Sequence, residues 1–170
     1  MKPKLYLMMG YPGAGKTTAA KVIQQLTGAV HLSSDEMRVQ INDAPNFTAA
    51  EHDQLYKQLN QTTEKLLREG HSVIYDANLN RQQHRQEKYD ICKRTGATPV
   101  LLWVQTQKTL AKQRALDRQQ SHLIPNNETA EQLFDRIANL IEEPDASEQA
   151  TIIDGTKVSP EYLSSLLFNK

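Results

Sequence analysis

Short apolar runs alternate along the chain with longer stretches in which apolar residues recur every three or four positions. The short runs are KLYLMM (4–9), VHLS (30–33), HSVIYDA (71–77), TPVLLWV (98–104) and TIID (151–154). Helical patterns separate and follow these runs, the first of them beginning at Thr17. Strands that alternate with helices in this way predict an α/β fold with a parallel sheet of about five strands, covered by helices on both faces.

Two of the helical stretches have a clean apolar stripe. One stripe predicts a long helix stopped by Gly70, and it consists of Tyr56, Leu59, Thr63, Leu66 and Leu67. The other predicts a helix stopped by Pro144, and it consists of Leu133, Phe134, Ile137, Leu140 and Ile141. We expect both stripes to belong to the hydrophobic core.

The length and composition favour one folded domain. A chain of 170 residues buries one core but is short for two typical domains, so we expect a single domain over residues 1–170. Hydrophobic residues make up 38% and charged residues 24%, and the periodic apolar positions argue against a disordered chain. The first residues contain no secretory or membrane-spanning segment, which favours a cytoplasmic protein without a membrane partner. The single cysteine, Cys92, has no disulfide partner and is expected to be a packed thiol, with no structural metal in the protein.

Charge is balanced overall but distributed unevenly. The formal net charge is zero, which argues against nonspecific coating of nucleic acid. Residues 81–118 contain nine Lys or Arg against three acids, whereas residues 128–148 contain seven acids against one Arg. The basic stretch is where an anionic ligand would be held, although solvated helix faces would give much the same counts.

The stretch GYPGAGKTT, residues 10–18, follows the first predicted strand and opens the first predicted helix. It matches the P-loop pattern G-x-x-x-x-G-K-[ST] in the structural context that the pattern requires. In such a loop, backbone N–H groups surround phosphate oxygens, the lysine reaches the β and γ phosphates, and the hydroxyl ligates Mg²⁺. No N/T-K-x-D stretch that would read guanine is present, so we expect ATP as the nucleotide. The expected nucleotide-binding residues are Gly10, Pro12, Gly13, Ala14, Gly15, Lys16, Thr17 and Thr18, and Thr17 is also an expected Mg²⁺ ligand.

A second group of polar residues lies in HLSSDEMR, where the second predicted strand ends. Asp35 follows the strand and Arg38 lies three residues later, on the same face of the next helix. Here a carboxylate can accept the proton of an attacking hydroxyl, and an arginine can bind an acceptor phosphate or the migrating phosphoryl group. The alternative is helix capping by Ser33, Ser34 or Asp35, with Arg38 in a surface ion pair.

The third group is VIYDANLNRQQHR, in which an apolar run ends at Asp76. Asp76 can hold a Mg²⁺-bound water or position the acceptor, and Asn78 in the following loop is a further candidate for acceptor binding. Arg81 and Arg85 are expected on one face of the next helix.

The fourth group is LAKQRALDRQQ, with Arg114 and Arg118 four residues apart on a predicted helix. They precede QQSHLIPNN (119–127), a stretch typical of a loop. We expect a mobile lid around residues 114–127, whose arginines neutralise the transferring phosphoryl group and whose closure excludes water. The alternative is a solvated helix face.

With these motifs the chain resembles P-loop kinases like the 5′-hydroxyl polynucleotide kinase domain of phage, within a broad family of small ATP-binding kinases. The resemblance covers nearly the whole chain and implies a P-loop NTPase fold of the nucleoside-kinase-like type. It implies that Asp35 is the general base, that Arg38 contacts the acceptor-side phosphate, and that Arg118, with Arg114 as a weaker assignment, contacts the nucleotide. The chain departs from the bifunctional phage enzyme because it lacks the D-x-D-x-T signature of the phosphatase domain.

The leading hypothesis is therefore an ATP- and Mg²⁺-dependent phosphotransferase that acts on a hydroxyl group, with Lys16, Asp35, Arg38 and Arg118 as catalytic residues. Asp35, Arg38, Asp76 and Asn78 are the expected acceptor-binding residues, and Thr17 and Asp76 the expected metal ligands. The acceptor is either a polynucleotide 5′ end or a small molecule such as a sugar, a nucleoside or another metabolite. An ATPase switch acting on a protein partner and an inactive nucleotide-binding module remain as alternatives from other classes.

Overall fold

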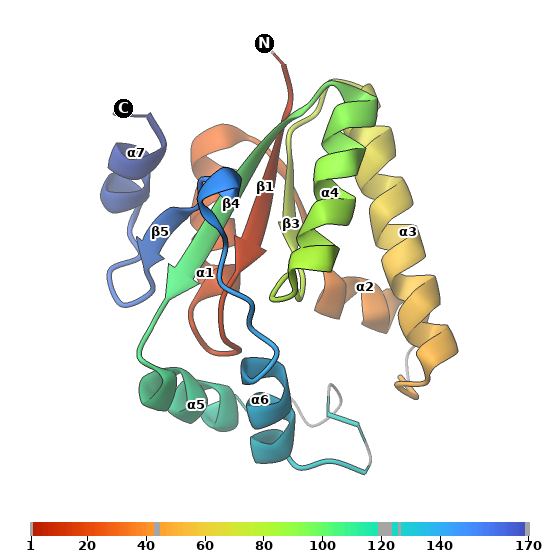
Figure 1. Ribbon diagram of the computed structural model, residues 1–170, viewed down its shortest axis with the longest axis vertical. Helices are drawn as coiled ribbons and strands as arrows, with labels where there is room; N and C mark the ends of the chain where they lie inside the picture. Colours follow the sequence, from red (N-terminus) through yellow and green to blue (C-terminus); the bar gives the residue numbers. More distant parts are fainter. Residues whose placement is uncertain (1, 43–44, 119–123, 126, 169–170) are drawn as a thin grey trace.

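A computed structural model describes residues 2–42, 45–118, 124–125 and 127–168, in which five strands form a single parallel sheet (Figure 1). The elements in chain order are β1 (Lys4–Met9), α1 (Lys16–Thr27), β2 (Val30–Ser33), α2 (Ser34–Ile41), α3 (Ala49–Arg68), β3 (Val73–Asp76), α4 (Gln82–Thr95), β4 (Thr98–Gln105), α5 (Lys108–Asp117), α6 (Ala130–Ala138), the 3₁₀ turn η2 (Ala146–Glu148), β5 (Thr151–Asp154) and α7 (Pro160–Phe168). The strand order is β2-β3-β1-β4-β5, and every neighbouring pair is parallel. The predicted fold class and all five predicted strands are confirmed. No helix in these described ranges is both long and apolar enough to cross a membrane.

Helices cover both faces of the sheet, so the central strand β1 is buried on both sides. Leu5 and Leu7 point to the face covered by α3 and α4, whereas Tyr6 and Met8 point to the face covered by α1 and α7 (Figure 1). Cys92 of α4 is buried in the first of these layers, where burial raises the pKa of its thiol to about 11. The expectation of a packed thiol is therefore confirmed.

The first predicted stripe forms core as expected, but the second does so only in part. In α3, Leu59, Thr63 and Leu67 are buried, and the helix ends at Arg68, before Gly70 at φ +88°. The second helix, α6, ends at Ala138, so Leu140 and Ile141 lie beyond it, and both are half-buried.

The interpretation of the second stripe as core was right for Phe134 but wrong for two other residues of α6, for a physical reason. Only Phe134 and Ala138 of α6 are buried, and they pack on Ala111 of α5. Leu133 and Ile137 instead line the large cavity at the carboxyl ends of the strands. An apolar stripe shows that a helix has an apolar face, but it does not show what covers that face.

A buried ion pair fixes the loop that follows β3. The Arg85 guanidinium donates to both Glu148 carboxylate oxygens, at 2.7 and 2.8 Å, and these side chains are 0% and 5% exposed. It also donates to the backbone carbonyls of Leu79 and Asn80, at 3.1 and 3.2 Å. Arg85 is thus fully buried, while Arg81 is the N-cap residue of α4 and is exposed. The prediction that these two arginines share a helix face was wrong.

We expect Glu148→Gln to lower the free energy of unfolding by about 3 kcal/mol, because it leaves a buried guanidinium without its counter-charge. Urea unfolding measures this loss. Glu64→Gln is the matched control: Glu64 pairs with Arg68 and Arg94, which are 55% and 53% exposed, so water replaces the lost contacts at little cost. Equal stability of the two variants would show that the buried pair does not hold the loop.

Candidate functional site

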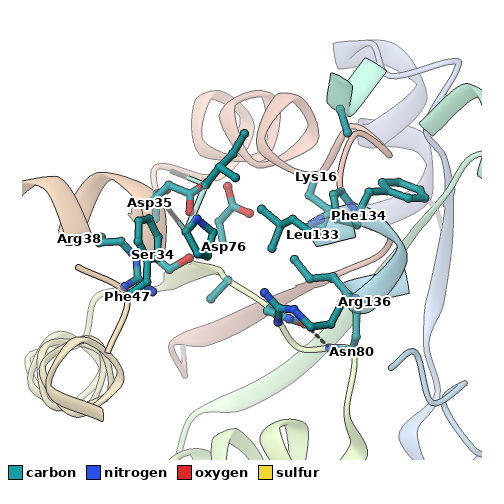
Figure 2. Close-up of a pocket in the computed structure, with 18 of the residues that line it drawn as sticks. Lys16, Ser34, Asp35, Arg38, Phe47, Asp76, Asn80, Leu133, Phe134 and Arg136 are labelled. Carbon is teal, nitrogen blue, oxygen red and sulfur yellow. Dashed lines mark hydrogen bonds between the residues drawn. The ribbon is translucent and has the colours of Figure 1, made fainter. Parts of the chain in front are cut away.

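A cavity of about 650 Å³ opens where the strands β1, β2 and β3 end. Its volume is typical of small-molecule sites, and the carboxyl edge of a parallel sheet is the usual place for one. α2, α5 and α6 lie beyond this edge of the sheet (Figure 1). Figure 2 shows Asp35, Arg38 and Phe47 on one side of the cavity and Lys16 and Phe134 on the other, with Asp76 between them.

The fold brings most of the predicted site residues to this cavity. Those that line it are Gly10, Pro12, Gly13, Gly15, Lys16, Thr17, Asp35, Arg38, Asp76, Asn78 and Arg118. Three predicted nucleotide-binding residues do not line it. Ala14 is buried and its carbonyl accepts a hydrogen bond from Thr106 at 2.9 Å, Thr18 is exposed on α1, and Arg114 donates to the Gly155 carbonyl at 3.3 Å.

At two positions of the loop between β1 and α1, the backbone lies so close to neighbouring backbone atoms that only glycine fits. Gly10 has φ +146° and Gly13 has φ +76°. A Cβ atom would lie 2.4 Å from the Val104 carbonyl oxygen at Gly10 and 2.1 Å from the Ala111 carbonyl oxygen at Gly13. The Gly10 N–H also donates to Asn80 Oδ1 at 3.3 Å, which ties the loop to the one fixed by Arg85. The loop is therefore held tightly against β4, α5 and the loop after β3.

The start of α1 fits an anion. Its N-cap residue, Gly15, makes no side-chain cap, so free backbone N–H groups and the positive end of the helix dipole meet at the cavity. Lys16 Nζ donates to the carbonyls of Gly10 and Tyr11, at 3.1 and 2.9 Å. Burial lowers the pKa of Lys16, while Asp76 and Asp35 act in the opposite direction.

The Asp76 carboxylate and the Thr17 hydroxyl lie side by side at the start of α1. Thr17 Oγ1 donates to Asp76 Oδ2 at 2.8 Å, and His31 Nε2 lies 3.1 Å from the same oxygen. Burial acts to raise the pKa of Asp76, but the His31 hydrogen bond and the Lys16 charge hold it below its usual value. An ionised carboxylate beside a hydroxyl is the donor set that Mg²⁺ prefers, so these residues fit that ion.

The sequence analysis missed His31. The only signal was a polar residue inside the predicted strand VHLS, next to the strand that ends in Asp76.

Capping of α2 falls to Ser33 and leaves Asp35 free. Ser33 Oγ accepts a hydrogen bond from the Glu36 N–H at 3.4 Å. Asp35 has no hydrogen-bond partner in the part of the chain that the structure describes, and it opens into the cavity. Desolvation, followed by the negative charge of Asp76, raises the pKa of its carboxyl group. The capping alternative for Asp35 therefore has no support in this geometry.

Arg38 has a carboxylate partner that the sequence did not reveal. Arg38 Nη1 lies 2.5 Å from Glu51 Oε1 of α3, and its guanidinium lies over the Phe47 ring, 5.0 Å from the centroid. The stretch TAAE, residues 48–51, is typical of a capping box. The Thr48 hydroxyl does accept from the Glu51 N–H at 3.2 Å, but the Glu51 side chain turns to Arg38.

Two cations of the basic stretch pair with acids of the acidic stretch. Arg85 pairs with Glu148, and Lys112 pairs with Glu131 and Asp135. The expectation that the basic stretch gathers around an anion was thus largely wrong, because several of its charges serve contacts within the fold. Arg118, at the C-cap of α5, lines the cavity and has no carboxylate partner among the described residues.

The predicted lid around residues 114–127 lies partly outside the described residues, which omit 119–123 and 126. Its first residues belong to the last turn of α5, where Arg118 reaches the cavity and Arg114 does not. Arg136 of α6 also lines the cavity, and both of its contacts with the Glu128 carboxylate are 2.7 Å long. The sequence analysis missed Arg136 because it lies in the acidic stretch.

Known proteins share this fold. A family model described as an AAA domain matches residues 5–144. A candidate kinase of Chloroflexus aurantiacus J-10-fl has a TM-score of 0.79 at 15% identity, covering 99% of this chain and 98% of its own. A gluconokinase of Sinorhizobium meliloti 1021 has a TM-score of 0.65 at 13% identity, covering 98% and 90%. A chain of the Pnkp1/Rnl/Hen1 RNA repair complex has a TM-score of 0.67 at 18% identity, covering 81% of this chain and 44% of its own. No curated protein matches the sequence. At these identities the structural likenesses show the fold alone.

Proposed function

Because the chain belongs to this AAA domain family and has a P-loop kinase-like fold, we propose that it transfers the γ-phosphoryl group of Mg·ATP to a hydroxyl acceptor. One observation carries the proposal: Asp35, a carboxylate without a partner among the described residues, opens into the same cavity as the glycine loop and Lys16. A carboxylate at this place can accept the proton of an attacking hydroxyl group, and the experiment below distinguishes an acceptor hydroxyl from water.

The donor half of the site holds the nucleotide phosphates. Backbone N–H groups of the loop and of the first turn of α1 bind phosphate oxygens, and Lys16 leaves its loop carbonyls to contact the β and γ phosphates. Arg118 neutralises charge on the transferring group. Thr17 and Asp76 would hold Mg²⁺, directly or through water, and the ion supplies further neutralisation of the phosphates when bound.

The acceptor half supplies the base and the contacts that orient the hydroxyl. The Asp35 carboxylate accepts the hydroxyl proton as the new O–P bond forms and the bond between the γ-phosphorus and ADP breaks. Arg38 and Asn78 line this half and can donate hydrogen bonds to acceptor oxygens. Asp76 lies between the donor and acceptor halves of the cavity. It can therefore act as a metal ligand and also limit the positions open to the acceptor.

The proposal is tested by measuring ADP release from Mg·ATP with and without a mixture of sugars, nucleosides and 5′-hydroxyl oligonucleotides. A kinase releases ADP faster when its acceptor is present, whereas an ATPase switch releases it at the same rate in both samples. If every fraction of the mixture left the rate of ADP release unchanged, the result would argue against phosphotransfer.

Arg118→Ala is expected to lower kcat by about 10³-fold with little change in ATP affinity, since charge on the phosphoryl group grows mainly in the transition state. Single-turnover kinetics and calorimetric ATP binding separate the two effects. Arg136→Ala is the control: Glu128 already neutralises this cavity arginine, so kcat should change only a few-fold. Normal turnover in Arg118→Ala would remove this arginine from the mechanism.

A further inference from the structure

Carboxylates outnumber cations on the acceptor side of the cavity. Asp35 and Asp53 line it, and Glu51 lies directly behind Arg38. Asp53 is exposed on α3 and has no hydrogen-bond partner within the described residues. Of the cations labelled in Figure 2, Arg38 lies beside Asp35, whereas Lys16 and Arg136 lie farther from it.

The Arg38 guanidinium already has a carboxylate partner. Its pair with Glu51 is nearly closed to water, with side chains 12% and 7% exposed, and the Phe47 ring covers the guanidinium. The Glu51 carboxylate is itself fixed, because its second oxygen accepts N–H groups from Asn46 at 2.6 Å and Phe47 at 3.3 Å. Burial acts to raise the pKa of Glu51, but these contacts and Arg38 hold it below its usual value, so the pair is ionised at neutral pH. Arg38 therefore offers hydrogen-bond donors to an acceptor, while Glu51 offsets part of its positive charge.

Aromatic side chains complete this wall of the cavity. His52 and Tyr56 are one turn apart on α3, and their ring centroids are 4.5 Å apart. Burial, followed by the positive charge of Arg38, lowers the pKa of His52, so this ring adds no charge at neutral pH. Together with Phe47, these rings offer flat apolar faces of the kind that pack against sugar or base rings.

The two halves of the cavity thus differ in charge. Lys16 and Arg118 line the cavity and form no ion pair within the described chain, so their positive charge remains for the nucleotide phosphates. Figure 2 shows the separation, with Lys16 across the cavity from Asp35 and Arg38. A phosphate on the acceptor would lie against Asp35, Asp53 and an arginine already paired with Glu51, which is unfavourable.

We propose that the acceptor is a small hydroxyl-bearing ring compound without a phosphate group, and not a polynucleotide. This inference rests on the proposed function. In a polynucleotide, a phosphate follows the nucleoside that carries the 5′-hydroxyl, and it would meet the carboxylates of the acceptor side. Uncharged hydroxyl groups instead donate to Asp35 and Asp53 and accept from Arg38, and the ring packs on the aromatic wall. An ammonium group on the ring is also compatible with this surplus of carboxylates.

Matched pairs of ligands test the proposal. A nucleoside is compared with its 3′-monophosphate, and a hexose with its phosphate, by calorimetric binding to protein saturated with Mg²⁺ and a non-hydrolysable ATP analogue. We expect at least one uncharged member to bind ten times more tightly than its phosphorylated partner. Equal or tighter binding of both phosphorylated members, or no binding of any of the four, would overturn the proposal.

Variants assign the preference to the charges described above. Glu51→Gln removes the carboxylate partner of Arg38. It should reduce the ratio of affinities between an uncharged ligand and its phosphorylated partner by about tenfold. Because Glu51 is buried, Asp53→Asn on the exposed side provides a second variant with the same expected direction. Glu64→Gln, which removes a carboxylate of α3 outside the cavity, should leave the difference unchanged. An unchanged difference in both Glu51→Gln and Asp53→Asn would overturn the role of these charges.

Transfer of γ-labelled phosphate to the same ligands separates this proposal from the proposed function. Label on a phosphorylated member in preference to its uncharged partner would overturn the acceptor class and support the kinase. Tight binding of the uncharged member without label on any ligand would support the acceptor class and count against the kinase.

Discussion

Asp35→Ala is expected to lower kcat by about 10²–10⁴-fold, the usual contribution of a general base, while the Kd for ATP changes by less than about twofold. The carboxylate opens into the cavity without a partner among the described residues, and the cap of α2 is Ser33, so the substitution removes no cap of the helix. Steady-state kinetics with an acceptor and calorimetric ATP titration measure the two quantities. Loss of ATP binding in this variant would remove the assignment of Asp35 as base.

Two further variants sharpen this result. Asp35→Asn keeps the size of the side chain but cannot accept a proton, so it should lose as much activity as Asp35→Ala. Glu36→Gln changes the next acid of α2, which is exposed and outside the cavity, and should retain full activity.

The pH profile of the wild type tests the same assignment. Desolvation and Asp76 raise the pKa of Asp35, and only its carboxylate form accepts a proton. We therefore expect kcat to fall as the pH decreases through a value above the usual aspartate pKa of about 3.9.

Lys16→Ala is expected to lower kcat by about 10²–10³-fold and also to weaken ATP binding, because Lys16 is the cation at the start of α1 that can reach the phosphates. The effect on binding distinguishes it from Asp35→Ala. The same kinetic and calorimetric measurements apply, with thermal unfolding to establish that the variant is folded.

The matched control is Lys21→Ala, which removes an exposed lysine of the same helix that does not line the cavity. It should leave both kcat and ATP binding unchanged. If Lys16→Ala also left them unchanged, the loop between β1 and α1 would not be a phosphate-binding loop.

Much of the fold was predictable because local signals and long-range packing agree. The runs at 4–9, 30–33 and 151–154 match β1, β2 and β5 residue for residue. The glycine loop was predictable for a similar reason: two of its glycines meet backbone oxygens so closely that no other residue fits. By contrast, the stripe in α6 looked like core, but Leu133 and Ile137 face a cavity, and periodicity cannot distinguish the two surroundings.

The acceptor side was less predictable because its character depends on contacts between elements. Arg38 was predicted to meet a phosphate, but its charge is paired with Glu51, thirteen residues away on another helix. The basic stretch was read as a place for an anion, but Arg85 and Lys112 pair with the acidic stretch. In both cases the sequence shows which charges are present, and only the fold shows which of them remain free.

The most direct measurement of the proposed function is transfer of γ-labelled phosphate from Mg·ATP to hydroxyl acceptors, with wild-type and Asp35→Ala proteins side by side. The acceptors are sugars, nucleosides, and 5′-hydroxyl DNA and RNA oligonucleotides. We expect label on at least one acceptor with the wild type, and transfer at least about 10²-fold slower with Asp35→Ala. Equal ATP hydrolysis by both proteins, with no label on any acceptor, would contradict phosphotransfer and indicate an ATPase instead.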